Sequence, residues 1–120
     1  MTETVLPEMT ATQTPLPVRP APRLDLPAPD VGASSAMAAL IADPTRAGIL
    51  AMLRAGPHCV CEMAAALDER QNNVSNHLAR LREAGLVRAS RHGADGRWVY
   101  YERDVEACER AAAMVAEVLR

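Results

Sequence analysis

The sequence predicts a mainly α-helical fold with one β-hairpin, an α+β class, in a single small domain. The chain has 120 residues, a length that suits one domain. Apolar residues recur three and four apart in five segments, as on the buried faces of helices. One pair of β-rich segments flanks a turn with two glycines. Because the aromatic residues are one Trp and two Tyr, the core must consist of Ala, Leu, Val, Ile and Met.

Residues 1–34 differ in composition from the rest of the chain. They contain seven of the nine prolines and no apolar periodicity, which blocks both helices and strand pairing, so we expect a disordered tail. The composition of the tail suits either an arm that binds a partner or an extension that has no selected function. We expect the folded domain over residues 35–120. A domain of about 86 residues has a small core, which favours dimerisation.

The sequence gives no sign of a membrane segment. No apolar run reaches the roughly 18 to 20 residues needed to cross a bilayer, and the Pro-rich start lacks the apolar stretch of a signal peptide. Three cysteines, Cys59, Cys61 and Cys108, cannot pair completely. We therefore expect a cytoplasmic protein with no membrane partner, whose thiols bind a metal or take part in redox chemistry.

The first two helices are predicted by spacing and by capping residues. Met37, Leu40 and Ile41 lie three and four apart, which predicts a short helix. In the next segment, Asp43-Pro44 supplies an N-cap followed by proline at the first helical position. Gly56-Pro57 is expected to end that second helix.

Two further helices follow closely. Val60 to Leu67 forms a third helix of about two turns, because its apolar residues fall at i, i+3, i+4 and i+7. The fourth helix is expected over roughly Asn72 to Ala84, with Gly85 as a left-handed cap. Its apolar side chains, which we expect to be buried, are Val74, Leu78 and Leu81.

A hairpin and a last helix complete the domain. Leu86 to Arg91 and Arg97 to Arg103 are β-rich arms around a glycine-containing turn, which predicts a β-hairpin. Asp104 to Leu119 is expected to form the final helix, with an apolar seam that suits another helix. The seam consists of Val105, Cys108, Ala112, Val115 and Leu119.

This order of elements predicts a winged helix-turn-helix, in which the second helix of the motif enters the major groove of DNA. The polar face of the fourth helix offers amide forks for adenine edges and an arginine fork for guanine or phosphate. His77 either contacts a phosphate or packs against the neighbouring helix. The candidate DNA-binding residues on this helix are Gln71, Asn72, Asn73, Ser75, Asn76, His77 and Arg80.

Positive charge is concentrated in the same region, although the whole chain carries a formal charge of −2. Residues 70–103 contain seven arginines against three carboxylates, a local balance of +4. Arg91 and Arg97 flank the hairpin turn, so we expect them to contact phosphates or the minor groove as a wing, rather than to be merely solvated.

The Cys59-Val60-Cys61 segment predicts a ligand-responsive switch. If Val60 belongs to the buried stripe of a regular helix, the two cysteines point about 200° apart and cannot reach one ion. An extended or unwound start would point them the same way. We therefore expect ion binding to distort the first turn of the helix, or to use a start that is already frayed, and so to move the adjacent reading helix.

Two further residues have two interpretations each. Cys108 is either a small buried hydrophobe of the last helix or a third sulfur ligand, within one protomer or across a dimer. His58 is either a nitrogen ligand beside the cysteine pair or an exposed side chain with no role. Sulfur ligands favour soft ions, among them As(III), Sb(III), Cd(II) and Pb(II).

Several motifs together resemble the ArsR/SmtB family of metal-responsive winged-helix repressors. The resemblance covers about residues 35 to 105 and implies a homodimer joined through its first and last helices. It also implies operator binding in the metal-free state and release when the inducer binds. The segments that carry it are Asp43-Pro44-Thr45-Arg46, Cys59-Val60-Cys61-Glu62-Met63, Asn73-Val74-Ser75-Asn76-His77-Leu78, Glu83-Ala84-Gly85-Leu86-Val87 and Trp98-Val99-Tyr100-Tyr101.

We accordingly expect a dimeric repressor that leaves double-stranded operator DNA when As(III) or Sb(III) binds Cys59 and Cys61, with Cys108 as a third ligand. A Cd(II)/Pb(II)-responsive or a thiol-redox-responsive repressor of the same fold is an alternative, and a metal-buffering protein without DNA binding is another. An enzyme is not expected, because the sequence has no Gly-rich phosphate loop, no His-Glu-x-x-His and no Ser-His-Asp set.

Overall fold

The computed structural model describes residues 25–94 and 96–120. The described part of the chain contains five helices and one two-stranded antiparallel sheet. This confirms the predicted mainly helical fold with a β-hairpin. The elements are α2 (Gly32–Ala42), α3 (Pro44–Leu53), α4 (Val60–Leu67), α5 (Gln71–Glu83), β1 (Val87–His92), β2 (Trp98–Arg103) and α6 (Val105–Leu119).

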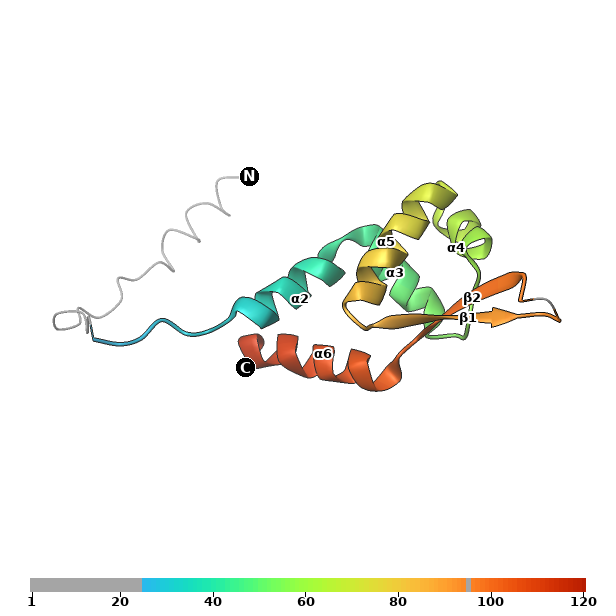
Figure 1. Ribbon diagram of the computed structural model, residues 1–120. Coiled ribbons are helices and arrows are strands. Elements are labelled where there is room, and N and C mark those ends of the chain that lie inside the picture. The colour runs from blue at the N-terminus through green and yellow to red at the C-terminus, as the bar shows by residue number, and fades with distance from the viewer. Residues whose placement is uncertain (1–24, 95) are drawn as a thin grey trace, which may run out of the picture.

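Figure 1 shows how these elements are arranged. Helices α3, α4 and α5 form a compact group on one side of the hairpin, and α6 runs back from the hairpin to lie beside α2. The tip of the hairpin projects away from the end of the molecule where α2 and α6 meet. The arrangement is a winged helix-turn-helix with α4 and α5 as the motif and β1–β2 as the wing.

The predicted capping residues act as expected. Asp43 Oδ1 accepts the backbone N–H groups of Thr45 at 2.9 Å and Arg46 at 3.0 Å, so it caps the start of α3. Gly85 ends α5 with a φ of 82°, in the left-handed region that glycine tolerates best. Because these local signals set the helix ends, the observed bounds differ from the predicted ones by only a few residues.

The start of the folded domain differs slightly from the prediction. Helix α2 begins at Gly32, so residues 32–34, which we had placed in the tail, are helical. Residues 25–31 are exposed and contain no helix or strand. The remainder of the predicted tail, residues 1–24, lies outside the described residues.

The core is entirely aliphatic and sulfur-containing, as the composition predicts. Its largest members have at most 1% of their surface exposed, and burying a side chain of this size stabilises the fold by about 1.5–3 kcal/mol. The buried residues are Ile49, Leu53, Met63, Ala64, Val74, Leu78, Leu81, Leu86, Val87 and Ala111. They come from α3, α4, α5, the start of the wing and α6, so a single core holds α5 against its neighbours.

Only part of the apolar seam predicted on α6 packs against this core. Ala111 is the buried residue of α6, with Ala107 and Cys108 packed beside it, whereas Val105 and Leu119 are 57% and 82% exposed. The helical period alone could not tell the face that packs within the chain from an apolar face left at the surface.

Among the described residues, no single helix is long and apolar enough to span a membrane.

Candidate functional site

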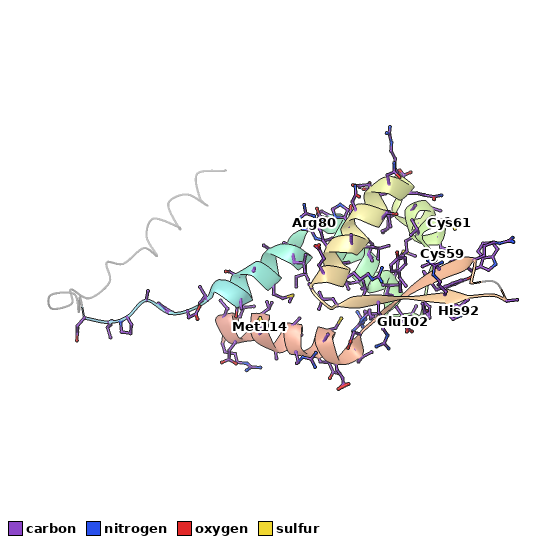
Figure 2. All side chains as sticks on the ribbon, in the orientation of Figure 1. Cys59, Cys61, Arg80, His92, Glu102 and Met114 are labelled. Atoms are coloured by element: carbon purple, nitrogen blue, oxygen red, sulfur yellow. The ribbon has the colours of Figure 1, made fainter. Side chains whose placement is uncertain are left out.

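The two cysteines of the Cys59-Val60-Cys61 segment lie side by side. Their Sγ atoms are 2.8 Å apart and share a hydrogen bond between free thiols. Cys59 is the N-cap of α4, with an extended backbone (φ −88°, ψ 167°), and the helix begins only at Val60. Figure 2 shows both thiols at the start of α4, at the end of the molecule where the hairpin lies.

This geometry corrects the expectation that helix geometry would separate the two sulfurs. That expectation placed Cys59 inside a regular helix, but an extended N-cap residue is outside it, and residues i and i+2 of an extended segment point the same way. Both thiols can therefore reach one ion without unwinding α4. The open start that the second predicted route requires is therefore present, and ion binding itself stays a prediction.

The segment before α4 is tied to the wing by an antiparallel bridge. The His58 backbone N–H donates to the Tyr101 carbonyl at 3.1 Å, and the Tyr101 N–H donates to the His58 carbonyl at 2.8 Å. On the other side, the Cys59 N–H donates to Glu62 Oε1 at 2.9 Å. The thiol pair therefore sits at a junction where β2 and the first turn of α4 are both held by hydrogen bonds.

Electrostatics at this junction follow from burial and hydrogen bonding. Partial burial, and then the hydrogen bond with Cys61, raises the pKa of the Cys59 thiol. The backbone N–H of Cys59 lowers the pKa of Glu62, and the His58 ring, 3.5 Å from the same carboxylate oxygen, adds to this. The ring of His58 therefore faces Glu62, which is neither of the two roles considered for it from the sequence.

Cys108 is not part of this cluster. It is half-buried on α6 against the core, and its Sγ lies 3.5 Å from the Leu86 carbonyl, to which it donates. Within the described part of one protomer, no group of three His, Cys, Asp or Glu side chains is placed to hold a metal ion. The arrangement fits the interpretation of Cys108 as a core residue.

Helix α5 turns a polar face to solvent and buries Val74, Leu78 and Leu81. Most of the predicted DNA-binding residues of this helix are exposed on the polar face, where a DNA groove could receive them. These exposed residues are Gln71, Asn72, Ser75, Asn76 and Arg80.

Two of the predicted DNA-binding residues are instead engaged within the protein. The Asn73 amide donates to Glu69 Oε1 at 2.6 Å, and Thr45 of α3 donates to the other oxygen of the same carboxylate at 3.2 Å. His77 Nδ1 accepts from Arg46 Nη1 at 3.0 Å. Of the two roles open for His77, packing against the neighbouring helix is the one observed.

These contacts fix the orientation of α5 on α3. Arginine has no acceptor, so His77 Nδ1 must be unprotonated to accept the Arg46 bond. His77 Nε2 lies 3.9 Å from Asp43 Oδ1, the atom that also caps α3. The role of Asp43 as a cap can be predicted from the sequence, but its link to His77 cannot, because residues 34 positions apart meet only when α3 and α5 pack.

The wing carries the remaining candidate residues. Arg91 and Arg97 are exposed beside the turn, and Arg91 Nη1 donates to the Gly96 carbonyl at 3.1 Å. Arg88 differs from them, because it pairs with Glu102 across the hairpin at 3.0 Å. At the base of the hairpin, the positive charge of Arg88 is therefore paired with a carboxylate.

Comparisons with known proteins agree with this architecture. The family model described as "Bacterial regulatory protein, arsR family" matches residues 43–89. The "Arsenical resistance operon repressor" of Escherichia coli (strain K12) is 39% identical over 82 residues, which are 68% of each chain. This chain belongs to the arsR family. It is a DNA-binding transcriptional regulator and not an enzyme.

Solved structures of similar regulators share the arsR-family fold. A possible transcriptional regulator for arsenical resistance superposes with a TM-score of 0.63 and 28% identity, covering 70% of this chain and 84% of that one. The antimony-specific transcriptional repressor AntR superposes with a TM-score of 0.56 and 26% identity, covering 80% and 86%.

The Asp43 contacts predict an acid-sensitive fold. Backbone hydrogen bonds, the first of them from Arg46, lower the pKa of Asp43 below its ordinary 3.8. A lowered folded-state pKa gives stability that is present above the ordinary value and is lost as pH falls through the folded-state pKa. Asp43→Asn keeps a good N-cap without this carboxylate.

In urea titrations between neutral pH and pH 2, the free energy of unfolding of the wild type should therefore fall more steeply below pH 3.8 than that of Asp43→Asn. Parallel curves for the two proteins would show that Asp43 does not contribute to the acid sensitivity.

Proposed function

We propose that this chain is a repressor that binds operator DNA as a homodimer and is released when As(III) or Sb(III) binds the thiols of Cys59 and Cys61. The single observation that carries this proposal is the 2.8 Å contact between the two sulfurs at the N-cap of the helix preceding the reading helix. Sulfur ligands select soft ions. The names of the arsenical and antimony-specific relatives support the choice of metalloid.

Hydrogen bonds connect the proposed ion site to the wing and to α4. An ion bonded to both sulfurs replaces the hydrogen bond between them, so loading the site changes the positions of the two thiols. Because His58 is paired with Tyr101 and the Cys59 N–H with Glu62, this movement pulls on both the wing and α4.

The protonation state of the thiols sets the pH dependence of this step. The raised pKa of Cys59 means that its thiol carries a proton at neutral pH. When an As–S bond forms, that proton leaves with one hydroxide of As(OH)₃ as water, so no net proton is released. The affinity for arsenite should therefore change little with pH as long as both thiols are protonated. A reducing cytoplasm, where we place the protein, keeps both thiols available.

The DNA contacts are proposed for the exposed face of α5 and for the wing. Asn and Gln side chains pair with adenine edges, and Arg pairs with guanine or phosphate. We assign Asn73 and His77 a positioning role, because both hold α5 on its neighbours. The proposed contact residues are Gln71, Asn72, Ser75, Asn76, Arg80, Arg91 and Arg97.

The homodimer is supported by apolar surface that one protomer leaves uncovered. On α6, Val118 and Leu119 are 55% and 82% exposed. This helix lies beside α2, so the two form one continuous end of the molecule (Figure 1). Association through that end would bury these side chains and would leave α5 and the wing free for DNA.

A thiol-redox response is a second candidate, because thiols in contact are well placed to form a disulfide. It requires the same two cysteines but a different effector. Release of DNA by an oxidant, without release by arsenite, would favour it over the metalloid response. Cd(II) and Pb(II) are the other soft ions to compare with arsenite.

A gel-shift titration with arsenite tests the switch. The double variant Cys59→Ser/Cys61→Ser should bind operator DNA but remain bound when arsenite is added. A typical coupling of about 1 to 3 kcal/mol corresponds to a 5- to 150-fold loss of DNA affinity in the wild type. Cys108→Ser is the matched control and should respond like the wild type. Normal arsenite release of the double variant would refute the proposed site.

The salt dependence of DNA binding tests the wing. Arg91→Ala should reduce the slope of log K against log salt by about 0.9, the value for one lost phosphate contact. Arg120→Ala removes an arginine paired with Glu117 at the far end of α6 and should leave the slope unchanged. Fluorescence anisotropy with labelled operator at several salt concentrations gives both values. Equal slopes for wild type and Arg91→Ala would remove Arg91 from the interface.

A further inference from the structure

An aromatic pocket lies on the wing, and none of the assignments above uses it. It has a volume of about 520 Å³ and is lined by Pro57, His92, Trp98 and Tyr100. The rings of His92 and Tyr100 meet edge to face, with centroids 5.2 Å apart. Trp98 is 58% exposed, so a large apolar ring faces solvent there.

Strand register places this pocket on the same face of the sheet as Cys59. In the hairpin His92 pairs with Trp98, so these side chains share one face, and Tyr100 shares it because it lies two residues from Trp98. The isolated antiparallel bridge between His58 and Tyr101 places the 57–59 segment along the edge of β2.

Side-chain alternation then decides where Cys59 points. His58 and Tyr101 share the opposite face, so their neighbours Cys59 and Tyr100 both lie on the face of the pocket. Pro57, two residues before Cys59, is itself part of the pocket lining. Figure 2 shows Cys59, Cys61 and His92 at the same end of the molecule. Cys59 therefore lies on the face of the sheet that carries the aromatic pocket, next to Pro57 and Tyr100 of its lining.

The number of sulfur ligands indicates which kind of arsenical the thiol pair and the pocket would bind together. Trivalent arsenic forms three covalent bonds, and the pair supplies two. Among the described residues of the protomer no third ligand joins the cluster. An arsenical that already carries one carbon substituent needs two sulfurs and no more, and an apolar substituent would be covered by the aromatic side chains.

Resting on the proposed function, we infer that the preferred inducer is an organic trivalent arsenical, R–As(OH)₂, whose aryl or alkyl group R occupies the pocket lined by Trp98 and Tyr100. Each thiol forms an As–S bond and one As–O bond breaks for each. The two thiol protons leave with the two hydroxides as water. Arsenic stays in the +3 state and no electrons are transferred.

The pocket suits an uncharged substituent. Among the described residues, its lining contains no Asp, Glu, Lys or Arg side chain. The His92 ring is already engaged, because its Nε2 lies 3.0 Å from Ser90 Oγ. Covering the exposed ring of Trp98 removes apolar surface from water, which favours a flat apolar group over a hydroxyl at the third position of arsenic.

The test compares phenylarsine oxide with arsenite by isothermal titration calorimetry on the full chain. The wild type should bind phenylarsine oxide more tightly than arsenite. Trp98→Ala should weaken phenylarsine oxide binding by about tenfold, the size expected for a lost aromatic contact, and should leave arsenite binding within about twofold. Trp98→Phe should restore the aryl preference. Val99→Ala, on the opposite face of the hairpin, is the matched control and should behave like the wild type.

A second readout uses Trp98 directly, because it is the one tryptophan of the chain. Its fluorescence should change when phenylarsine oxide binds the wild type, and should not change when Cys59 and Cys61 are both serine. If Trp98→Ala binds phenylarsine oxide as tightly as the wild type while arsenite binding is intact, the pocket inference is overturned and the proposed function stands. If the wild type binds neither compound, the proposed function itself fails.

Discussion

The antiparallel pairing of His58 with Tyr101 is the contact on which the rest of the site depends. It draws the segment before α4 onto the edge of the wing, which keeps Cys59 extended and outside the helix. The extended N-cap brings Cys59 Sγ to within 2.8 Å of Cys61. The same pairing places Cys59 on the face of the sheet that carries the aromatic pocket. Without it, Cys59 could join the helix, and helical geometry would separate the two sulfurs.

The junction between β2 and the first turn of α4 also explains how a small ligand could affect DNA binding at a distance from the thiols. The proposed ion site lies between two elements that meet DNA in the proposed complex, the wing and the helix-turn-helix, and its backbone is hydrogen-bonded to both. A second network, linking Asp43, Arg46 and His77, holds α5 on α3. A change in the positions of the thiols therefore acts on elements that are hydrogen-bonded to one another.

The fold could be predicted from the sequence because its signals are local. Asp43-Pro44, Gly85 and the apolar spacing of Val74, Leu78 and Leu81 each act within a few residues, and the structure places the helices accordingly. The site could be predicted only in part. The residues of the cysteine pair were identified, but their relative position depends on pairing between His58 and Tyr101, 43 positions apart, which no local pattern reveals. For the same reason the engagement of Asn73 by Glu69 and Thr45, and the pocket around Trp98, were not foreseen.

Hydrogen exchange at the His58 and Tyr101 amides tests the central claim most directly, because these two N–H groups form the bridge between thiol pair and wing. The account predicts that arsenite lowers the protection of both amides in the wild type and leaves it unchanged when Cys59 and Cys61 are serine. Unchanged protection in a wild-type protein that has bound arsenite and released its operator would contradict the account, because the signal would then travel by another route.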